Sequence, residues 1–173
     1  WSNDPVSDPQ GEVIYIMDPE TQNLISVTPS PIRDSGLYTI KHGLGYSKYI
    51  HSALNISYEG TVFVPLDDNI KITLLKLKNL TNTSRKLYLY YYINPALGVH
   101  REVSTHHIVT EFNKESDTIL ALNSYNTDFL GRAAFVSSGQ NISEFTCDED
   151  EFIGINRSLK NPRGIRENKL LNR

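Results

Sequence analysis

The sequence predicts an all-β domain, an antiparallel sandwich with a short helical or irregular tail at its C-terminus. Three observations predict this class. Apolar and polar residues alternate with a period of two in many short segments. Turn-forming residues separate those segments at short intervals. Helical periodicity is nearly absent, and the ten tyrosines suit half-buried sheet surfaces.

Residues 61–94 hold the clearest strand pattern of the chain. The last strand of this stretch places Leu87, Leu89, Tyr91 and Ile93 on one face, and Tyr88, Tyr90 and Tyr92 on the other. The strand before it covers 70–77, and the turn formers of 79–84 join the two. We therefore expect a hairpin at the centre of a sheet. If the leucine face is the core, Leu89→Ala should cost about 2–5 kcal/mol.

The same reasoning assigns the other elements in order. Strands are expected at residues 12–17, 24–27, 37–42, 46–51, 53–58, 61–64, 108–112, 118–122, 133–136 and 143–146. Gly43 and Gly45 predict a tight turn or a bulge after the third of these. The acidic run at 148–151 should open a helical turn, because negative side chains favour a helix N-terminus.

The predicted organisation is a β-sandwich domain over residues 1–155, followed by a linker over residues 156–173. The lead-in at 1–11 is rich in Pro, Asp and Ser and has no periodicity. The tail is polar and basic. A start at Trp1 and an open-ended tail lead us to expect a domain fragment of a longer chain.

Composition argues against several classes of protein. The net charge of −3 and the scattered Lys and Arg residues predict no nucleic-acid partner. The single cysteine, Cys147, makes an internal disulfide impossible and requires no oxidising compartment. No apolar run approaches the roughly 20 residues that span a bilayer.

Five histidines raise the question of a metal site. His106 and His107 are adjacent, so on a strand they would point to opposite faces. His42, His51 and His100 could complete a site, but the tight ligand spacing typical of zinc is missing. We expect no metal, and we expect one of His106 and His107 to be buried and hydrogen-bonded, with the other at the surface.

The carboxylates select no catalytic pair. Asp67 and Asp68 lie in an expected turn, and residues 148–151 are interpreted as a solvated run. Glycoside chemistry needs two carboxyl groups across a sugar, or one acid and an attacking phosphate. No Gly-x-Ser-x-Gly nucleophile elbow occurs. Spacing alone therefore selects no catalytic residue, and a Ser/His/Asp triad stays open at this point.

A polar aromatic loop at 123–129 is the best candidate for sugar binding. Aromatic faces stack on pyranose rings, while Asn, Asp and Arg side chains hydrogen-bond hydroxyl groups. Tyr125, Asn126, Asp128 and Arg132 form this cluster, and Tyr125, Asn126 and Arg132 are the candidate substrate-binding residues. The alternative is a loop capped by its own side chains.

Several segments together resemble a known family. They are YTIKHGLGYSKYIHS (38–52), VFVPLDDNIKITLLKLKN (62–79), RKLYLYYYINPALG (85–98), HHIVTE (106–111), NSYNTDFLGRAAFV (123–136) and FTCDEDEFIGINRS (145–158). In this order they resemble the N-terminal β-sandwich domain of the cellobiose phosphorylase family of glycoside phosphorylases. The resemblance is strongest to the phosphorylase-like region of cyclic β-1,2-glucan synthases, and it covers residues 38–158.

The resemblance implies a super-sandwich of the galactose-mutarotase-like type, followed by a helical linker and an (α/α)₆ barrel. That barrel would hold the general acid and bind inorganic phosphate, the co-substrate of the parent enzyme, so this chain alone should be inactive. Implied partners are a β-glucan or β-glucoside, the catalytic barrel of the same polypeptide and a second copy in a homodimer. The implied location is the cytoplasm of a bacterium, or the cytoplasmic portion of an inner-membrane protein.

One position departs from the family pattern. Where cellobiose phosphorylases tend to place a basic residue beside the loop tyrosine, this chain has Asn126. That weakens a direct sugar-site role and agrees better with the glucan synthases. Three functions therefore stay open: a non-catalytic domain of a β-glucan phosphorylase or cyclic glucan synthase, a free-standing carbohydrate-binding module, and a structural sandwich that binds protein.

Overall fold

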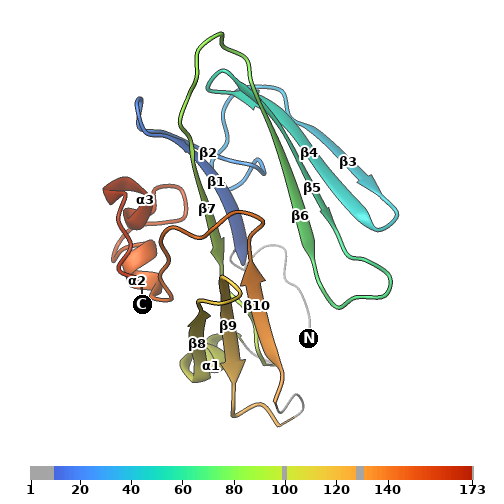
Figure 1. Ribbon diagram of the computed structural model, residues 1–173, viewed down its shortest axis with the longest axis vertical. Coiled ribbons are helices and arrows are strands. Elements are labelled where there is room, and N and C mark those ends of the chain that lie inside the picture. The colour runs from blue at the N-terminus through green and yellow to red at the C-terminus, as the bar shows by residue number, and fades with distance from the viewer. Residues whose placement is uncertain (1–9, 99–100, 128–130, 173) are drawn as a thin grey trace. The chain divides into compact units, whose positions relative to one another are not determined.

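The computed structural model describes residues 10–98, 101–127 and 131–172, and strands dominate them (Figure 1). The described strands form three sheets. The chain divides into two compact units, one over Glu12–Tyr92 and one over Trp1–Gly11 with Ile93–Arg173. The prediction of an all-β, antiparallel fold is confirmed.

The first unit contains an antiparallel four-stranded sheet in which each strand pairs with the next along the chain. Its strands are β3 (Thr39–Gly43), β4 (Tyr46–Ala53), β5 (Ile56–Phe63) and β6 (Ile72–Asn79). Leu54 and Asn55 join β4 to β5, with φ of 50° and 55°. Two consecutive residues at positive φ match the right-handed twist of the strands, so this turn sets their register.

The same unit contains a second sheet with the order β2-β1-β7. Its strands are β1 (Glu12–Asp18), β2 (Asn23–Ser26) and β7 (Tyr88–Ile93). β1 and β2 form an antiparallel hairpin. Arg85, just before β7, contacts Asp18 at the end of β1, whereas Tyr91 contacts Glu12 at its start. β7 therefore runs antiparallel to β1.

The predicted central hairpin of residues 70–93 is wrong. β6 pairs with β5 and is an edge strand, while β7 lies beside β1 in the other sheet. The turn between them does form, since Asn79 and Thr81 hydrogen-bond within it. This turn carries the chain from one sheet to the other. The sequence could not show this, because the alternation of side chains defines the two faces of a strand but not the strand with which it pairs.

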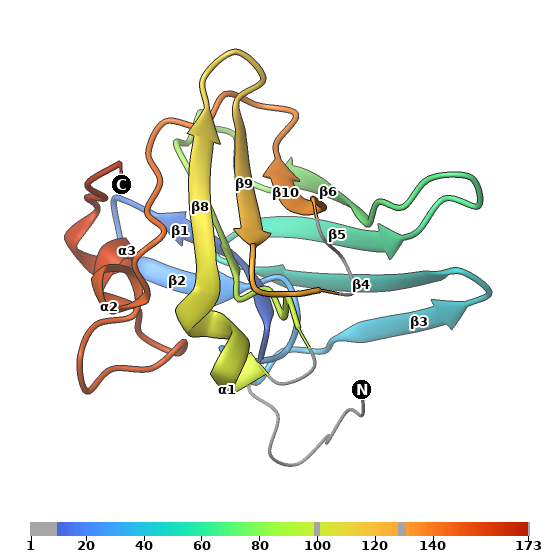
Figure 2. The same cartoon turned by 90° about the horizontal axis from the view of Figure 1, so that it is seen from below.

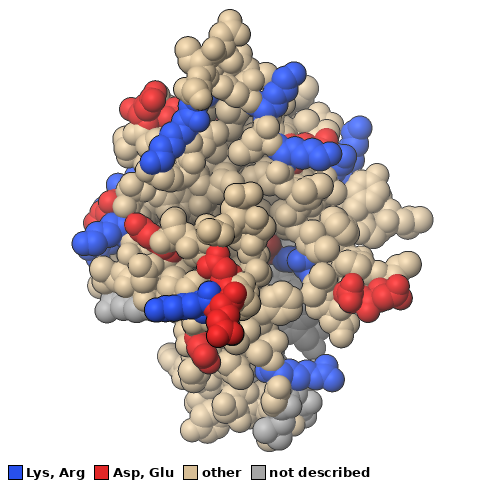
Figure 3. Space-filling model, in the orientation of Figure 1, with Lys and Arg blue, Asp and Glu red and all other residues tan. Residues whose placement is uncertain are grey.

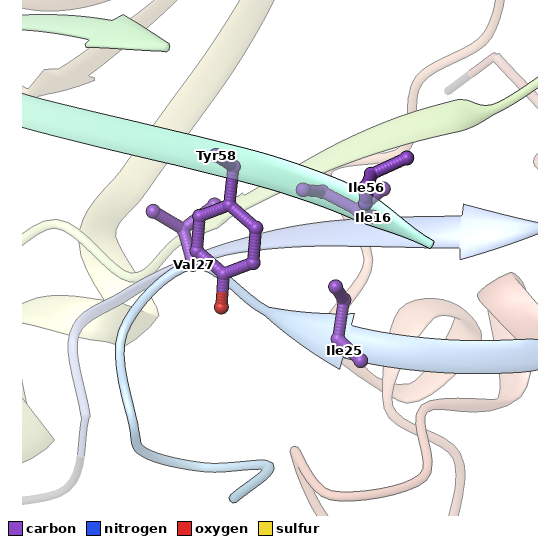
Figure 4. Packing of buried hydrophobic residues seen from close by; sticks show 5 residues of the cluster. All are labelled: Ile16, Ile25, Val27, Ile56 and Tyr58. Atoms are coloured by element: carbon purple, nitrogen blue, oxygen red, sulfur yellow. The ribbon is translucent and has the colours of Figure 1, made fainter. Parts of the chain in front are cut away.

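The core of this unit lies between its two sheets (Figure 4). The cluster consists of Ile16, Ile25, Val27, Ile56 and Tyr58, all of them buried. Tyr58 also donates a hydrogen bond from its hydroxyl to the carbonyl oxygen of Ser26, at 3.1 Å. This bond satisfies the polar end of a side chain that is otherwise packed among aliphatic groups.

The apolar face of β7 is only partly in the core, which corrects the expectation for Leu89. Leu87 packs against the core cluster, but Leu89 is 54% exposed and Tyr91 is 40% exposed. The buried residue of the strand is Tyr92, on the opposite face. The tyrosine face thus holds the most buried position of β7.

Leu89→Ala is therefore expected to cost less than about 1 kcal/mol, because a half-exposed side chain leaves no cavity when it is shortened. Urea-induced unfolding, followed by tyrosine fluorescence, gives the free energy of unfolding for the variant and the unchanged domain. A loss of about 2–5 kcal/mol would restore the original assignment of this face to the core.

The second unit contains an antiparallel three-stranded sheet with the order β10-β9-β8 (Figure 2). Its strands are β8 (Ile108–Asn113), β9 (Thr118–Asn123) and β10 (Ala133–Ser137). The predicted hairpin of 108–112 with 118–122 and the strand at 133–136 are confirmed. A short helix α1 (Arg101–Ser104) and a 3₁₀ turn (Thr105–His107) precede β8.

The C-terminal part of this unit holds two short helices, α2 (Glu149–Phe152) and α3 (Arg163–Glu167). Asp148 caps α2, because its carboxylate accepts a 3.0 Å hydrogen bond from the backbone N–H of Glu151. The predicted helical turn is confirmed, but residues 143–146 form no strand. Ile165 and Leu170 are buried, so the tail beyond residue 156 is packed. The boundary at 155 stays a prediction.

Candidate functional site

The predicted sugar-binding residues flank the connection between β9 and β10. Tyr125 and Asn126 follow β9, and Arg132 immediately precedes β10. The backbone N–H of Tyr125 donates to the side-chain oxygen of Asn123 at 3.0 Å, and Asn126 N–H donates to its carbonyl oxygen at 3.3 Å. Asn123 in turn donates to the carbonyl oxygen of Leu97 at 2.7 Å. The start of the loop is therefore anchored.

The structure brings Tyr125 to His107, a residue that the sequence analysis did not place in this cluster. Their ring centroids are 4.3 Å apart and their planes are tilted by 37°. Tyr125 is 76% exposed, so one side of its ring is open to solvent. Arg132 is also exposed, at the other end of the loop, and Asp128 lies outside the described residues. No sequence signal links 107 to 125, because the two strands of the β8–β9 hairpin separate them.

The histidines differ from the expectation. His106 and His107 lie on the 3₁₀ turn, so the argument from opposite strand faces does not apply to them. Neither is buried: His106 is exposed and His107 is half-buried. Within the described parts of the chain, no group of three or more His, Cys, Asp or Glu residues could hold a metal ion. His100 falls outside the described residues.

The buried histidine is His51, on β4, with 3% of its surface exposed. Its Nε2 atom lies 2.9 Å from the Asp34 carboxylate, and its Nδ1 atom lies 2.9 Å from the carbonyl oxygen of Leu37. Both ring nitrogens therefore face an oxygen that accepts hydrogen bonds. Tyr38 stacks on this ring at 3.8 Å. The group ties the segment before β3 to β4.

The contact between Asp34 and His51 should make the fold less stable in acid. The hydrogen bond from His51 holds the pKa of the Asp34 carboxyl below its ordinary value of 3.8. A lowered pKa in the folded state contributes stability above the unfolded value, and that contribution is lost as the pH falls through the folded value. The Asp34 side chain is 40% exposed, so we expect a contribution under about 1 kcal/mol.

The measurement is the free energy of unfolding at about pH 6 and about pH 3, for the unchanged domain and for Asp34→Asn. The asparagine keeps the size of the side chain and removes the titrating group, so its loss of stability in acid should be smaller. Equal losses in both proteins would show that Asp34 contributes nothing to acid sensitivity.

The acidic run of α2 is not simply a solvated face. Glu151 accepts hydrogen bonds from the Thr146 hydroxyl at 3.0 Å and from the Leu171 N–H at 2.6 Å. Asp148 caps the helix, whereas Glu149 and Asp150 are exposed. Asp67 and Asp68 are exposed in the β5–β6 connection. Glu151 thus holds the end of the tail at Leu171, whereas Asp148 caps its own helix.

These features define an all-β domain with two sheets around an aliphatic core, a third sheet in its own unit and an exposed aromatic loop. The whole chain, residues 1–173, matches the supersandwich domain of glycosyl hydrolase family 94, and it belongs to that family. The resemblance and the super-sandwich fold stated above are confirmed.

Named relatives agree with this assignment. The chain is 29% identical over 168 residues to cyclic beta-(1,2)-glucan synthase NdvB of Rhizobium meliloti, covering 95% of this chain and 6% of that protein. It is 26% identical over 178 residues to N,N'-diacetylchitobiose phosphorylase of Vibrio furnissii, covering 95% and 22%. The corresponding enzyme of Vibrio proteolyticus is 22% identical over 180 residues, with the same shares. This chain thus spans less than a quarter of each relative.

None of the helices in the described residues is long and apolar enough to cross a membrane.

Proposed function

We propose that this domain is a non-catalytic part of a larger carbohydrate-active enzyme, a β-glucan phosphorylase or a cyclic β-1,2-glucan synthase. The observation that carries the proposal is the match of all 173 residues to the supersandwich domain of glycosyl hydrolase family 94. Two relatives are named as a glucan synthase and a chitobiose phosphorylase, and these names support the proposed substrate class, a β-linked glucoside or glucan.

In this proposal the domain supports a catalytic (α/α)₆ barrel in the same polypeptide. That barrel supplies the general acid and binds inorganic phosphate. The relatives support this division of labour, because this chain accounts for only 6% and 22% of their lengths. We also propose a homodimer, and a location in the cytoplasm or at the cytoplasmic side of an inner membrane. The free, exposed Cys147 needs no oxidising compartment, which agrees with that location.

The test uses the complete polypeptide and a variant without residues 1–173. With a β-1,2-linked glucan and inorganic phosphate, we expect the complete protein to release a sugar phosphate. The shortened variant should lose most of this activity through instability, which is visible as a lower melting temperature of the remaining protein. A complete polypeptide that is inactive on β-linked glucosides and glucans would contradict the proposed function.

A second function, direct sugar binding, rests on one observation. The anchored, exposed ring of Tyr125 beside His107 offers a flat aromatic surface of the kind that stacks on a pyranose. Asn126 and Arg132 would supply hydrogen-bonding groups along the same loop. In this reading the domain also works as a carbohydrate-binding module.

Calorimetric titration of the domain with β-glucan oligosaccharides tests this second function. Tyr125→Ala should abolish the heat of binding. Tyr46→Ala removes a tyrosine that is 43% exposed on β4, and it should leave binding unchanged. If neither the unchanged domain nor the control variant gives a signal, the loop has no binding function of its own.

A further inference from the structure

The outer face of the four-stranded sheet carries a cluster of lysines. Ile56 and Tyr58 of β5 point into the core, so their neighbour Glu59 lies on the opposite, outer face of the strand. Four lysines share that face, and together they are called the lysine face below: Lys41 on β3, Lys48 on β4, and Lys76 and Lys78, two residues apart on β6.

The strand register places these lysines on one side of the sheet, because residues that pair across strands point to the same face. Glu59 pairs with Lys76, and Thr61, which shares the face of Glu59, pairs with Lys48. Lys48 pairs in turn with Lys41. The lysine face therefore extends over all four strands, a width of about 14 Å.

The lysine face has a surplus of positive charge. Along these four strands, which the structure describes in full, Glu59 is the one acidic side chain on this face. Its carboxylate lies 2.9 Å from the Lys48 ammonium and 4.0 Å from that of Lys76. The hydrogen bond from Lys48 holds the pKa of Glu59 below its ordinary value, so the carboxylate is charged at neutral pH. One carboxylate among four lysines leaves a surplus of three charges, on a chain with a net charge of −3.

One lysine pair works against the stability of the sheet. Lys41 and Lys48 lie directly opposite each other on neighbouring strands, where like charges repel. Lysines on edge strands keep a sheet from pairing with other chains, which explains Lys41 and the two lysines of β6. Lys48 lies on an inner strand, so edge protection does not explain it. A ligand with several negative groups would relieve this repulsion.

The acidic turn between β5 and β6 lies away from much of the lysine face. Asp67 and Asp68 follow the pair of Phe63 with Ile72 that ends the sheet. Lys76 lies four residues along β6 from Ile72, a distance of about 13 Å. This exceeds the screening length of about 8 Å in physiological salt. Figure 3 shows basic side chains grouped over the upper part of this sheet, with acidic side chains at its lower end.

The residue types of the lysine face favour a lipid surface over a single small anion. The outer face of the four described strands holds no arginine, the residue whose planar fork binds one phosphate group through two hydrogen bonds. Lysines are point charges that suit the diffuse field of many headgroups. Tyr46 and Leu74 lie on the same face, 43% and 49% exposed, and supply apolar contacts to the bilayer interface.

We propose that the lysine face binds an anionic lipid surface, with the four-stranded sheet lying flat on the headgroups. Charge complementarity selects this occupant, because a surplus of positive charge spread over four strands matches a surface with many negative groups. The contact is independent of the catalytic role proposed above, since it uses only side chains of the first unit.

Sedimentation with lipid vesicles tests the proposal. Purified residues 1–173 should bind vesicles that contain about 30% phosphatidylglycerol, and should not bind vesicles of pure phosphatidylcholine. Binding should weaken strongly between about 0.05 M and about 0.5 M salt, because salt screens the charges. The double variant Lys41→Gln with Lys78→Gln should bind about thirtyfold more weakly, since each lysine near such a surface contributes about fivefold.

Lys114→Gln with Lys160→Gln is the matched control. Both lysines are exposed and belong to the second unit. The control removes the same charge and should bind like the unchanged chain. Lys41→Gln also relieves the repulsion with Lys48, so the lysine-face variant should need the same or more urea to unfold. That result separates a loss of binding from a loss of fold.

The proposal is overturned by absence of binding to the anionic vesicles, by equal binding to neutral ones, or by equal weakening in the two double variants. Tighter binding to polyglutamate than to vesicles of equal negative charge would assign the face to an acidic protein instead. Displacement by millimolar inorganic phosphate at constant ionic strength would assign it to a free anion. Either result would likewise exclude the lipid surface.

Discussion

Asp18→Ala is expected to destabilise the domain by about 3–5 kcal/mol, because it leaves a buried guanidinium without its carboxylate partner. Asp18 and Arg85 approach to 2.8 Å, with side chains only 6% and 14% exposed. Burial would raise the pKa of the Asp18 carboxyl, but the Glu20 N–H and the Arg85 guanidinium together hold it below its ordinary value. The folded state therefore keeps the carboxylate charged.

Urea-induced unfolding near neutral pH measures this effect, with Lys71→Ala as the control. Lys71 pairs with Glu12 in the same unit, but its side chain is 44% exposed. Water solvates that pair, so the control should cost less than about 1 kcal/mol. Equal losses for the two variants would mean that the Asp18–Arg85 pair gains nothing from its burial.

Ile16→Ala is the second large effect, with an expected loss of about 2–5 kcal/mol. Ile16 is fully buried in the cluster between the two sheets of the first unit, beside Ile56 and Tyr58 (Figure 4). Shortening this side chain removes its contacts with both sheets and leaves a cavity that the surrounding strands fill only in part.

The same unfolding experiment checks this prediction, and Leu89→Ala is its control because Leu89 lies half-exposed on β7. The two changes remove side chains of equal volume from different environments. A larger loss of unfolding free energy for Leu89→Ala than for Ile16→Ala would show that the leucine face of β7 belongs to the core.

Local sequence signals predicted those elements whose structure is decided by near neighbours. The alternation at 12–17 predicted β1, and the paired runs around 113–116 predicted the β8–β9 hairpin. The acidic run at 148–151 predicted the helical turn α2. Each of these depends on side chains within a few residues of one another, so the sequence alone carries the information.

The pairing of strands that lie far apart in the chain could not be predicted from the sequence. The turn formers at 79–84 suggest a hairpin, yet β7 pairs with β1, more than sixty residues earlier. The leucine face of β7 was expected in the core, but the core is completed by Ile16, Ile25 and Ile56 from other strands. A strand with two well-patterned faces does not reveal which one is covered.

In the candidate site, too, local features were predicted from the sequence and tertiary contacts were not. The polar aromatic loop with Tyr125 was predicted from its composition, and its role in sugar binding stays a prediction. The contact of Tyr125 with His107 and the burial of His51 against Asp34 depend on tertiary structure. The repeated His at 106 and 107 drew attention by its sequence, whereas His51 stands in a weakly alternating strand without such a signal.

In the proposed function, catalysis takes place outside these residues. The most direct measurement is the release of sugar phosphate from a β-1,2-linked glucan and inorganic phosphate by purified residues 1–173. We expect no release above the protein-free blank, alongside clear release by the complete polypeptide. Sustained turnover by residues 1–173 alone would contradict it, because a catalytic acid and a phosphate site would then lie within this domain.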